Sequence, residues 1–161
     1  MEKGKELDAL LEKIQNDDEN PYSIDYYDLD NPNPFEWKIL LEGPNDTPYE
    51  NGYFVAKIIF PKDYPNSAPT IYFKTKIYHL NVNPDSGKVC FGNYDHNSIE
   101  DRIEFLYTFF VNQNPESPYG TDRAKMYTDN RSKFNEIARD WTRKYANMDD
   151  CDVITFDYFP K

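Results

Sequence analysis

Hydrophobic residues near the start of the chain recur with helical spacing. Leu7, Leu10, Leu11 and Ile14 follow the i, i+3, i+4, i+7 pattern of an amphipathic helix. The pattern predicts a first helix over residues 5–15. The acidic stretch that follows is rich in Pro and Asn and has no such period. We therefore expect a loop there, with a short edge strand around residues 23–27.

Runs of β-branched and aromatic residues predict the strands of one sheet. They cover residues 35–41, 53–60 and 70–73. The connections between them contain glycine and several prolines, which disfavour regular structure, and they are short enough to join neighbouring strands in antiparallel order. Together with the edge strand, these segments predict a four-stranded antiparallel meander. Its expected core residues are Trp37, Phe54 and Phe60.

Residues 75–97 show no clear period. They are mostly polar and contain Pro84, Gly87 and Gly92. A loop of this length inside a compact domain usually has a function, so this is where we expect the site.

Helical patterns return after this loop. Ser98 is placed to cap a helix that contains Ile99, and Thr121 opens a short helix. Asn130 opens a longer one, whose shared apolar face contains Phe134, Ile137, Ala138, Trp141 and Tyr145. The order of helix, sheet, long loop and helices predicts an α+β fold in a single domain, residues 1–148, followed by an acidic and aromatic tail, residues 149–161.

Charge and composition exclude several classes of function. The 161 residues carry a formal charge of −11, and no basic stripe offsets it, so nucleic acid is not an expected partner. The longest nearly apolar run, residues 105–111, is too short to span a bilayer, and the N-terminus lacks a signal-peptide stretch. We expect a soluble cytoplasmic or nuclear protein without a membrane partner. The two cysteines, Cys90 and Cys151, cannot form a disulfide framework and lie in no metal-binding pattern.

Several short strings occur together in the order and approximate spacing of a known family. They are Gly43-Pro44-Asn45-Asp46-Thr47-Pro48-Tyr49-Glu50, Phe60-Pro61 to Pro69, Tyr78-His79-Leu80-Asn81, Gly87-Lys88-Val89-Cys90, Asn114-Pro115-Glu116-Ser117-Pro118, and the pattern from Ala124 to Ala146. Each string alone is weak, but together they cover nearly the whole chain. In these strings the sequence resembles the ubiquitin-conjugating enzymes.

The chain also departs from the family pattern. Leu80 replaces the proline of the Tyr-His-Pro-Asn signature, and the interval from His79 to Cys90 is one residue longer than usual. Gly92 stands where an acidic residue is usual. The Trp-Ser-Pro-Ala loop that many members offer to ligases is missing, and residues 93–98 take its place.

The resemblance implies an acyl-transfer chemistry centred on Cys90. A lone cysteine is more often an inert buried residue, but this one follows the signature in a long loop. A thiolate accepts the C-terminal carboxyl of ubiquitin from an activating enzyme, and the thioester then reacts with a substrate lysine or a ligase cysteine. No cofactor is expected, because ATP is used by the activating enzyme upstream.

The resemblance assigns further residues to the site. Asn81 either stabilises the oxyanion or scaffolds the loop, and the two roles have equal weight. For His79, bracing of the loop is favoured over a role as a base. Ser117 is expected to assist the incoming lysine, and Tyr78 and Tyr119 to shape its channel. In place of the acid missing at Gly92, Asp95 or Glu116 is a candidate.

Two other functions stay open from the sequence. One is a non-catalytic ubiquitin-binding or scaffold module on the same fold, and the other is a conjugating enzyme for a different ubiquitin-like modifier. The expected partners are ubiquitin or a relative, the activating enzyme, a ligase and protein substrates. A dedicated ligase is an alternative to generic RING ligases, because the usual docking loop is absent. Acidic neighbours of Cys151 should raise the pKa of its thiol and weaken it as a nucleophile.

Overall fold

The computed structural model describes residues 2–147, so the tail and Cys151 lie outside the described residues. The first helix, α1 (Glu2–Gln15), begins three residues before the predicted start and ends where expected. Its periodic residues Leu7, Leu11 and Ile14 are buried, as the helical spacing predicts. Leu10 is only partly buried and packs at the margin of the core.

Four strands form the predicted antiparallel meander. They are β1 (Ser23–Tyr26), β2 (Glu36–Glu42), β3 (Tyr53–Ile59) and β4 (Thr70–Phe73), in the spatial order β1-β2-β3-β4. The register places buried residues of neighbouring strands opposite one another, as in Trp37 with Ile58 and Leu41 with Phe54. Side chains alternate between the two faces of a strand, so these pairs line one apolar face of the sheet.

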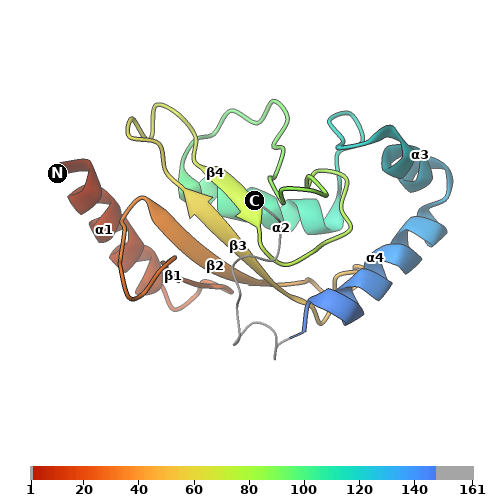
Figure 1. Cartoon of the computed structure of the whole chain (residues 1–161), viewed down its shortest axis with the longest axis horizontal. Helices are drawn as coiled ribbons and strands as arrows, with labels where there is room; N and C mark the ends of the chain where they lie inside the picture. Colours follow the sequence, from red (N-terminus) through yellow and green to blue (C-terminus); the bar gives the residue numbers. More distant parts are fainter. Residues whose placement is uncertain (1, 148–161) are drawn as a thin grey trace.

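The helix α2 (Ile99–Val111) lies behind the sheet in Figure 1 and covers its apolar face. Ser98 caps it as predicted, and its hydroxyl accepts a hydrogen bond from the backbone of Asp101 at 3.1 Å. On the buried side, the Phe110 ring lies 5.5 Å from Phe54 and 6.3 Å from Phe73, measured between ring centroids. This aromatic packing fixes the distance between the helix and the sheet.

Two further helices complete the fold at the end opposite α1, as Figure 1 shows. They are α3 (Thr121–Asp129) and α4 (Arg131–Tyr145), and the Asn130 side chain caps α4 by accepting from Lys133 N at 3.2 Å. Ile137 and Trp141, which lie on the predicted apolar face of α4, are only partly buried. The turn of the helix places them at the border of the face that Phe134 buries.

The connection between β2 and β3 folds tightly onto itself. A Cβ atom at Gly43 would lie 1.8 Å from the carbonyl oxygen of Tyr49, so only glycine fits there. This close approach holds Tyr49 fully buried beneath the loop that follows β4.

Candidate active site

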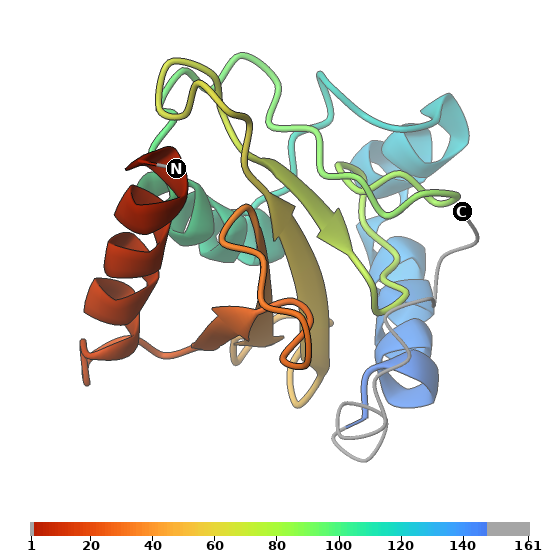
Figure 2. The ribbon, with the colours of Figure 1, turned by 60° about the vertical axis from the view of Figure 1, so that its left-hand side comes forward.

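Residues 74–98 connect β4 to α2 as the predicted long loop. Figure 2 shows its first part beside α4 and its second part running back toward the start of α2. Residues 82–89 form a narrow turn, in which Val82 pairs with Val89 and the side chain of Asn83 accepts from Asp85 N and Ser86 N. This turn brings Cys90 back next to Asn81.

Cys90 sits at the end of this turn with a free, half-buried thiol. Its backbone N–H donates to the carbonyl oxygen of Asn81 at 2.8 Å. Burial raises the pKa of the Tyr119 hydroxyl, and its electrostatic interaction with Cys90 is the second cause. The two side chains are therefore near each other. Cys90 is thus partly exposed, while its backbone N–H is held.

The Asn81 side chain is fully buried and already uses its hydrogen-bonding groups. Its Nδ2 donates to Asn114 O at 2.9 Å and to Ser117 O at 3.1 Å, and its Oδ1 accepts from Asn114 N at 2.8 Å. Both amide hydrogens are occupied, so in this state the side chain has no free donor for an oxyanion. The geometry favours the scaffolding role over the oxyanion role, because the amide ties residues 114–117 to the loop of Cys90.

His79 is buried, and both of its ring nitrogens have partners. Nε2 lies 2.8 Å from Phe109 O, and Nδ1 lies 3.0 Å from Asn81 N. The carbonyl needs a donor and the backbone N–H needs an acceptor, so the ring is neutral with its proton on Nε2. Burial lowers the pKa of His79 to about 4. With Nδ1 occupied, this side chain is suited to bracing the loop and not to accepting a proton.

Ser117 lies against the segment that follows Cys90. A Cβ atom built at Gly92 would lie 3.3 Å from Ser117 Oγ and 3.4 Å from Asn114 Nδ2. Gly92 also has a φ of 64°, which side chains rarely adopt. A side chain at this position would therefore be strained by the backbone, and the Ser117 and Asn114 side chains would have to give way slightly to admit it. Glu116 lies between these two residues and is exposed.

Tyr78, which the resemblance assigns to the lysine channel, packs its ring against α3 and α4. Its ring centroid lies 4.9 Å from that of Phe134 and 5.4 Å from that of Trp141. The Arg123 guanidinium stacks 4.2 Å from the ring, and the hydroxyl faces the sulfur of Met126. The side chain is turned into the packing of α3 and α4, where it contributes to the core.

The segment that replaces the Trp-Ser-Pro-Ala loop is anchored by one arginine of α2. Arg102 Nε donates to His96 O at 2.9 Å, and Arg102 Nη2 donates to Tyr94 O at 3.2 Å. The guanidinium also lies 4.5 Å from the Phe91 ring centroid. Asn97 Nδ2 then donates to Pro65 O and Asn66 O, each at 3.1 Å, and joins this segment to the turn after β3.

Two buried residues that organise the loop were not singled out in the sequence. Arg102 is the only basic residue of its helix, which is a signal that could have identified it. Gln113, whose Oε1 lies 2.7 Å from Leu80 N, gave no such signal, because a glutamine beside Asn-Pro is an ordinary loop residue.

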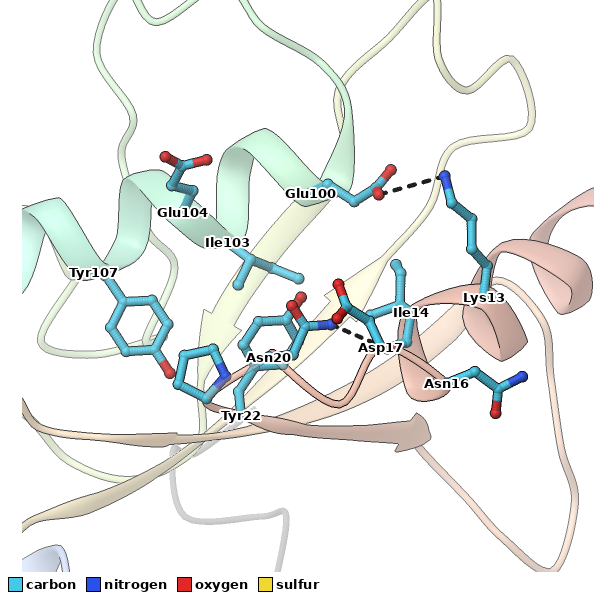
Figure 3. Close-up of a pocket in the computed structure, with 11 residues that line it drawn as sticks. Lys13, Ile14, Asn16, Asp17, Asn20, Tyr22, Glu100, Ile103, Glu104 and Tyr107 are labelled. Carbon is cyan, nitrogen blue, oxygen red and sulfur yellow. Dashed lines mark hydrogen bonds and ion pairs between the residues drawn. The ribbon is translucent and has the colours of Figure 1, made fainter.

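One cavity is separate from Cys90, because none of the residues that line it belongs to the loop of residues 74–98. It has a volume of about 500 Å³ and lies between the end of α1, residues 16–22 and α2, as Figure 3 shows. Its polar lining includes Asp17, Glu100 and Glu104, and Lys13 lies 3.8 Å from Glu100. Burial and the charges of Glu100 and Asp17 raise the pKa of Tyr22 to about 12. No cysteine or histidine lines the cavity, so nothing in it suits acyl transfer.

Neither a metal cluster nor a membrane span is found in the part of the chain that the structure describes. Residues 2–147 contain no group of three or more His, Cys, Asp or Glu side chains that could hold a metal ion. None of the helices within these residues is long and apolar enough to cross a membrane.

Comparisons with known proteins identify the family of the chain. A sequence profile described as ubiquitin-conjugating enzyme matches residues 5–142. Ubiquitin conjugating enzyme E2 B of Dictyostelium discoideum is 36% identical over 115 residues, which are 69% of this chain and 78% of that protein.

Two solved structures share the fold. A ubiquitin-conjugating enzyme from Plasmodium yoelii has a TM-score of 0.78 and 31% identity, covering 89% of this chain and 94% of that one. The E2 domain of a Toxoplasma gondii ubiquitin-conjugating enzyme also has a TM-score of 0.78, with 27% identity over 90% of this chain and 99% of that domain. The meander, the four helices and the profile match together show that the chain belongs to the ubiquitin-conjugating enzyme family.

Proposed function

We propose that this chain accepts ubiquitin on Cys90 as a thioester and transfers it to a substrate lysine or to a ligase. The observation that carries the proposal is a half-buried free thiol whose backbone is tied to Asn81, in the loop where the family resemblance places the nucleophile. Ubiquitin, the activating enzyme, a ligase and protein substrates are the proposed partners, and the proposed location is the cytoplasm or nucleus.

The charging step is an exchange of thioesters. The Cys90 thiolate attacks the C-terminal carbonyl of ubiquitin on the activating enzyme, a new C–S bond forms, and the C–S bond to the activating enzyme breaks. ATP is consumed upstream of this exchange, so the chain itself needs no cofactor. Cys90 is partly exposed, so we expect an acyl donor to reach its sulfur, while its backbone N–H is held by Asn81.

The discharge step transfers the acyl group to nitrogen. A substrate amine attacks the carbonyl, a C–N bond forms, the Cys90 thiolate leaves, and the amine loses a proton. Asn81 and His79 hold the loop in the proposed mechanism. Ser117, which lies beside Gly92, is the proposed contact for the incoming lysine. A direct oxyanion role for Asn81 would require one of its two amide hydrogens to leave a backbone carbonyl.

Ligase choice is the step in which this chain is expected to differ from other family members. Arg102 and Asn97 close residues 91–98 onto α2 and onto the turn at Pro65 and Asn66, where the family resemblance places the ligase surface. We therefore expect a dedicated ligase or direct substrate recognition, and weak stimulation by generic RING ligases.

A charging assay tests the function. The protein is incubated with activating enzyme, ATP-Mg and ubiquitin, and a non-reducing gel is run with and without thiol. A thiol-sensitive adduct is expected with wild type and with Cys151→Ser, and no adduct with Cys90→Ala. Absence of an adduct with ubiquitin and its relatives, from folded protein, would leave the non-catalytic binding module as the better reading. An adduct that forms with a relative of ubiquitin and not with ubiquitin would identify that relative as the modifier.

A further inference from the structure

Gln113 reaches from the connection after α2 to the backbone of the active-site loop. Only 8% of the residue is exposed. Its Oε1 accepts a hydrogen bond from Leu80 N at 2.7 Å. Leu80 lies between His79 and Asn81, so this bond holds the short segment that carries both site residues.

The other end of the same amide contacts the loop between β2 and β3. Gln113 Nε2 donates to the Tyr49 hydroxyl at 2.6 Å, and that hydroxyl donates to Tyr78 O at 2.6 Å. The orientation of the amide follows from these partners. Leu80 N needs an acceptor, and the hydroxyl hydrogen is engaged by Tyr78 O, so the oxygen of the amide faces Leu80 and its nitrogen faces Tyr49.

The backbone of Gln113 adds a third connection. Its N–H donates to the Tyr127 hydroxyl of α3 at 3.3 Å. One residue therefore joins α3, the β2–β3 connection and residues 78–80, which are distant in the sequence. These partners are buried, and a buried polar network of this kind is rigid when all its members are satisfied.

Leu80 makes the hydrogen bond from its backbone N–H to Gln113 Oε1 necessary. A leucine has a backbone N–H, whereas the proline of the signature has none, and a buried N–H needs an acceptor. Leu80 is fully buried, and its carbonyl oxygen accepts from Tyr119 N at 2.8 Å. The next residue is Asn81, whose carbonyl oxygen accepts from Cys90 N. Displacement of Leu80 would therefore pass directly to the backbone of Cys90.

We propose that Gln113 is a positioning residue for Cys90, acting through the Leu80 N–H and through Tyr49. This inference rests on the proposed function, because the thioester site is what the residue positions. Gln113 is buried, and its side-chain partners are Leu80 and Tyr49, so its proposed effect on Cys90 is indirect. Its loss should alter the transfer step without altering recognition by the activating enzyme.

The test compares three variants in a Cys151→Ser background, in which Cys90 is the only cysteine. Gln113→Met removes both side-chain bonds at similar volume, and Gln113→Glu keeps an acceptor for Leu80 N. Asn112→Met is the matched control, because Asn112 is exposed. Two rates are measured at a temperature where thermal melts show each variant folded: discharge of the ubiquitin thioester to free lysine, and alkylation of Cys90 by iodoacetamide.

Gln113→Met is expected to slow discharge about tenfold or more, since small misplacements of reacting groups are costly. The alkylation rate should shift in the same variant, while the KM for the charged activating enzyme stays unchanged. Gln113→Glu should fall between Gln113→Met and wild type, and Asn112→Met should match wild type. If Gln113→Met does not fold, the discharge and alkylation rates of Gln113→Glu, compared with those of Asn112→Met, decide whether Gln113 positions Cys90.

A double-mutant cycle tests the route through Leu80. Leu80→Pro removes the N–H, so Gln113→Met should have a smaller effect in that background than in wild type. Wild-type rates in folded Gln113→Met, or an equal effect in both backgrounds, would overturn the inference. If the parent chain fails to accept ubiquitin, the proposed function fails, while the alkylation rates still decide whether Gln113 positions Cys90.

Discussion

In the part of the loop before Cys90, buried uncharged side chains hold the backbone of residues 78–81: the amides of Asn81 and Gln113 and the neutral ring of His79. In residues 91–98, the anchor is the guanidinium of Arg102, with aromatic rings around it. Both halves are thus held by buried polar groups that have lost their water and must keep their partners. The groups of the first half connect to Cys90 through the backbone of Asn81, so substitutions there should act mainly at the transfer step. The second half depends on the buried guanidinium of Arg102, which contacts the carbonyls of Tyr94 and His96.

Asn81→Ala should have the largest effect. It removes three hydrogen bonds and leaves two carbonyl oxygens and an N–H of residues 114–117 without their partner. We expect a loss of about 3–5 kcal/mol in the free energy of unfolding, together with a strong decrease in lysine discharge. Denaturant titration and single-turnover discharge measure the two effects. Asn93→Ala, on an exposed residue of the second half, is the control and should change stability by less than about 0.5 kcal/mol.

Acid should destabilise the first half through His79. Its folded pKa of about 4 lies below the ordinary value of 6.5, so between these values the unfolded chain binds more protons. Stability that is fully present above pH 6.5 should decrease as the pH falls toward 4, by about 3 kcal/mol. Unfolding titrations at several pH values measure the slope. His79→Gln should remove this contribution, and exposed His96→Gln should keep it; equal slopes in the two variants would contradict the assignment.

Arg102→Met should disturb the second half alone. It removes two hydrogen bonds from a charged donor to the carbonyls of Tyr94 and His96. We expect a loss of about 1–3 kcal/mol and faster proteolytic cleavage within residues 91–98, with charging of Cys90 maintained. A loss of charging as large as in Asn81→Ala would show that the two halves are not independent. Arg139→Met, an exposed arginine of α4, is the matched control.

Ser117→Ala should have the smallest effect on the free energy of unfolding. It should slow lysine discharge and leave charging unchanged. Ser117 Oγ lies near Gly92 at the border between the two halves. Loss of one hydrogen bond to the incoming lysine corresponds to roughly a three- to tenfold slower discharge, with charging unchanged. Pulse-chase assays that separate the two steps measure this difference. An equal decrease in both steps would remove Ser117 from the proposed role, and Ser132→Ala on exposed α4 serves as the control.

The repeating patterns of the sequence predicted the fold well. Helical spacing identified α1, and the alternation and turn residues identified the meander, because each signal is local. The caps at Ser98 and Asn130 were also predictable. What periodicity could not resolve was the border of the core, where Ile137 and Trp141 remain partly exposed.

The site was predictable only in part, because its contacts join distant residues. Cys90 and Asn81 could be singled out by resemblance, but the partners of the Asn81 amide lie 33 and 36 positions away. The direction of the Tyr78 ring depends on the packing of α3 and α4, which no local pattern contains. Gln113 was missed for the same reason, since its partners Tyr49 and Leu80 are 64 and 33 positions distant.

The order in which the loop is completed has a consequence for biosynthesis. The backbone around Cys90 is closed by residues as late as Tyr119, which is 29 positions further along the chain. At translation speeds of about 5–20 residues per second, that interval lasts about 1.5–6 seconds. During these seconds, Cys90 has already been added to the nascent chain, but the residues that close the backbone around it have not. The backbone around Cys90 can therefore reach its final arrangement only after these later residues have been made.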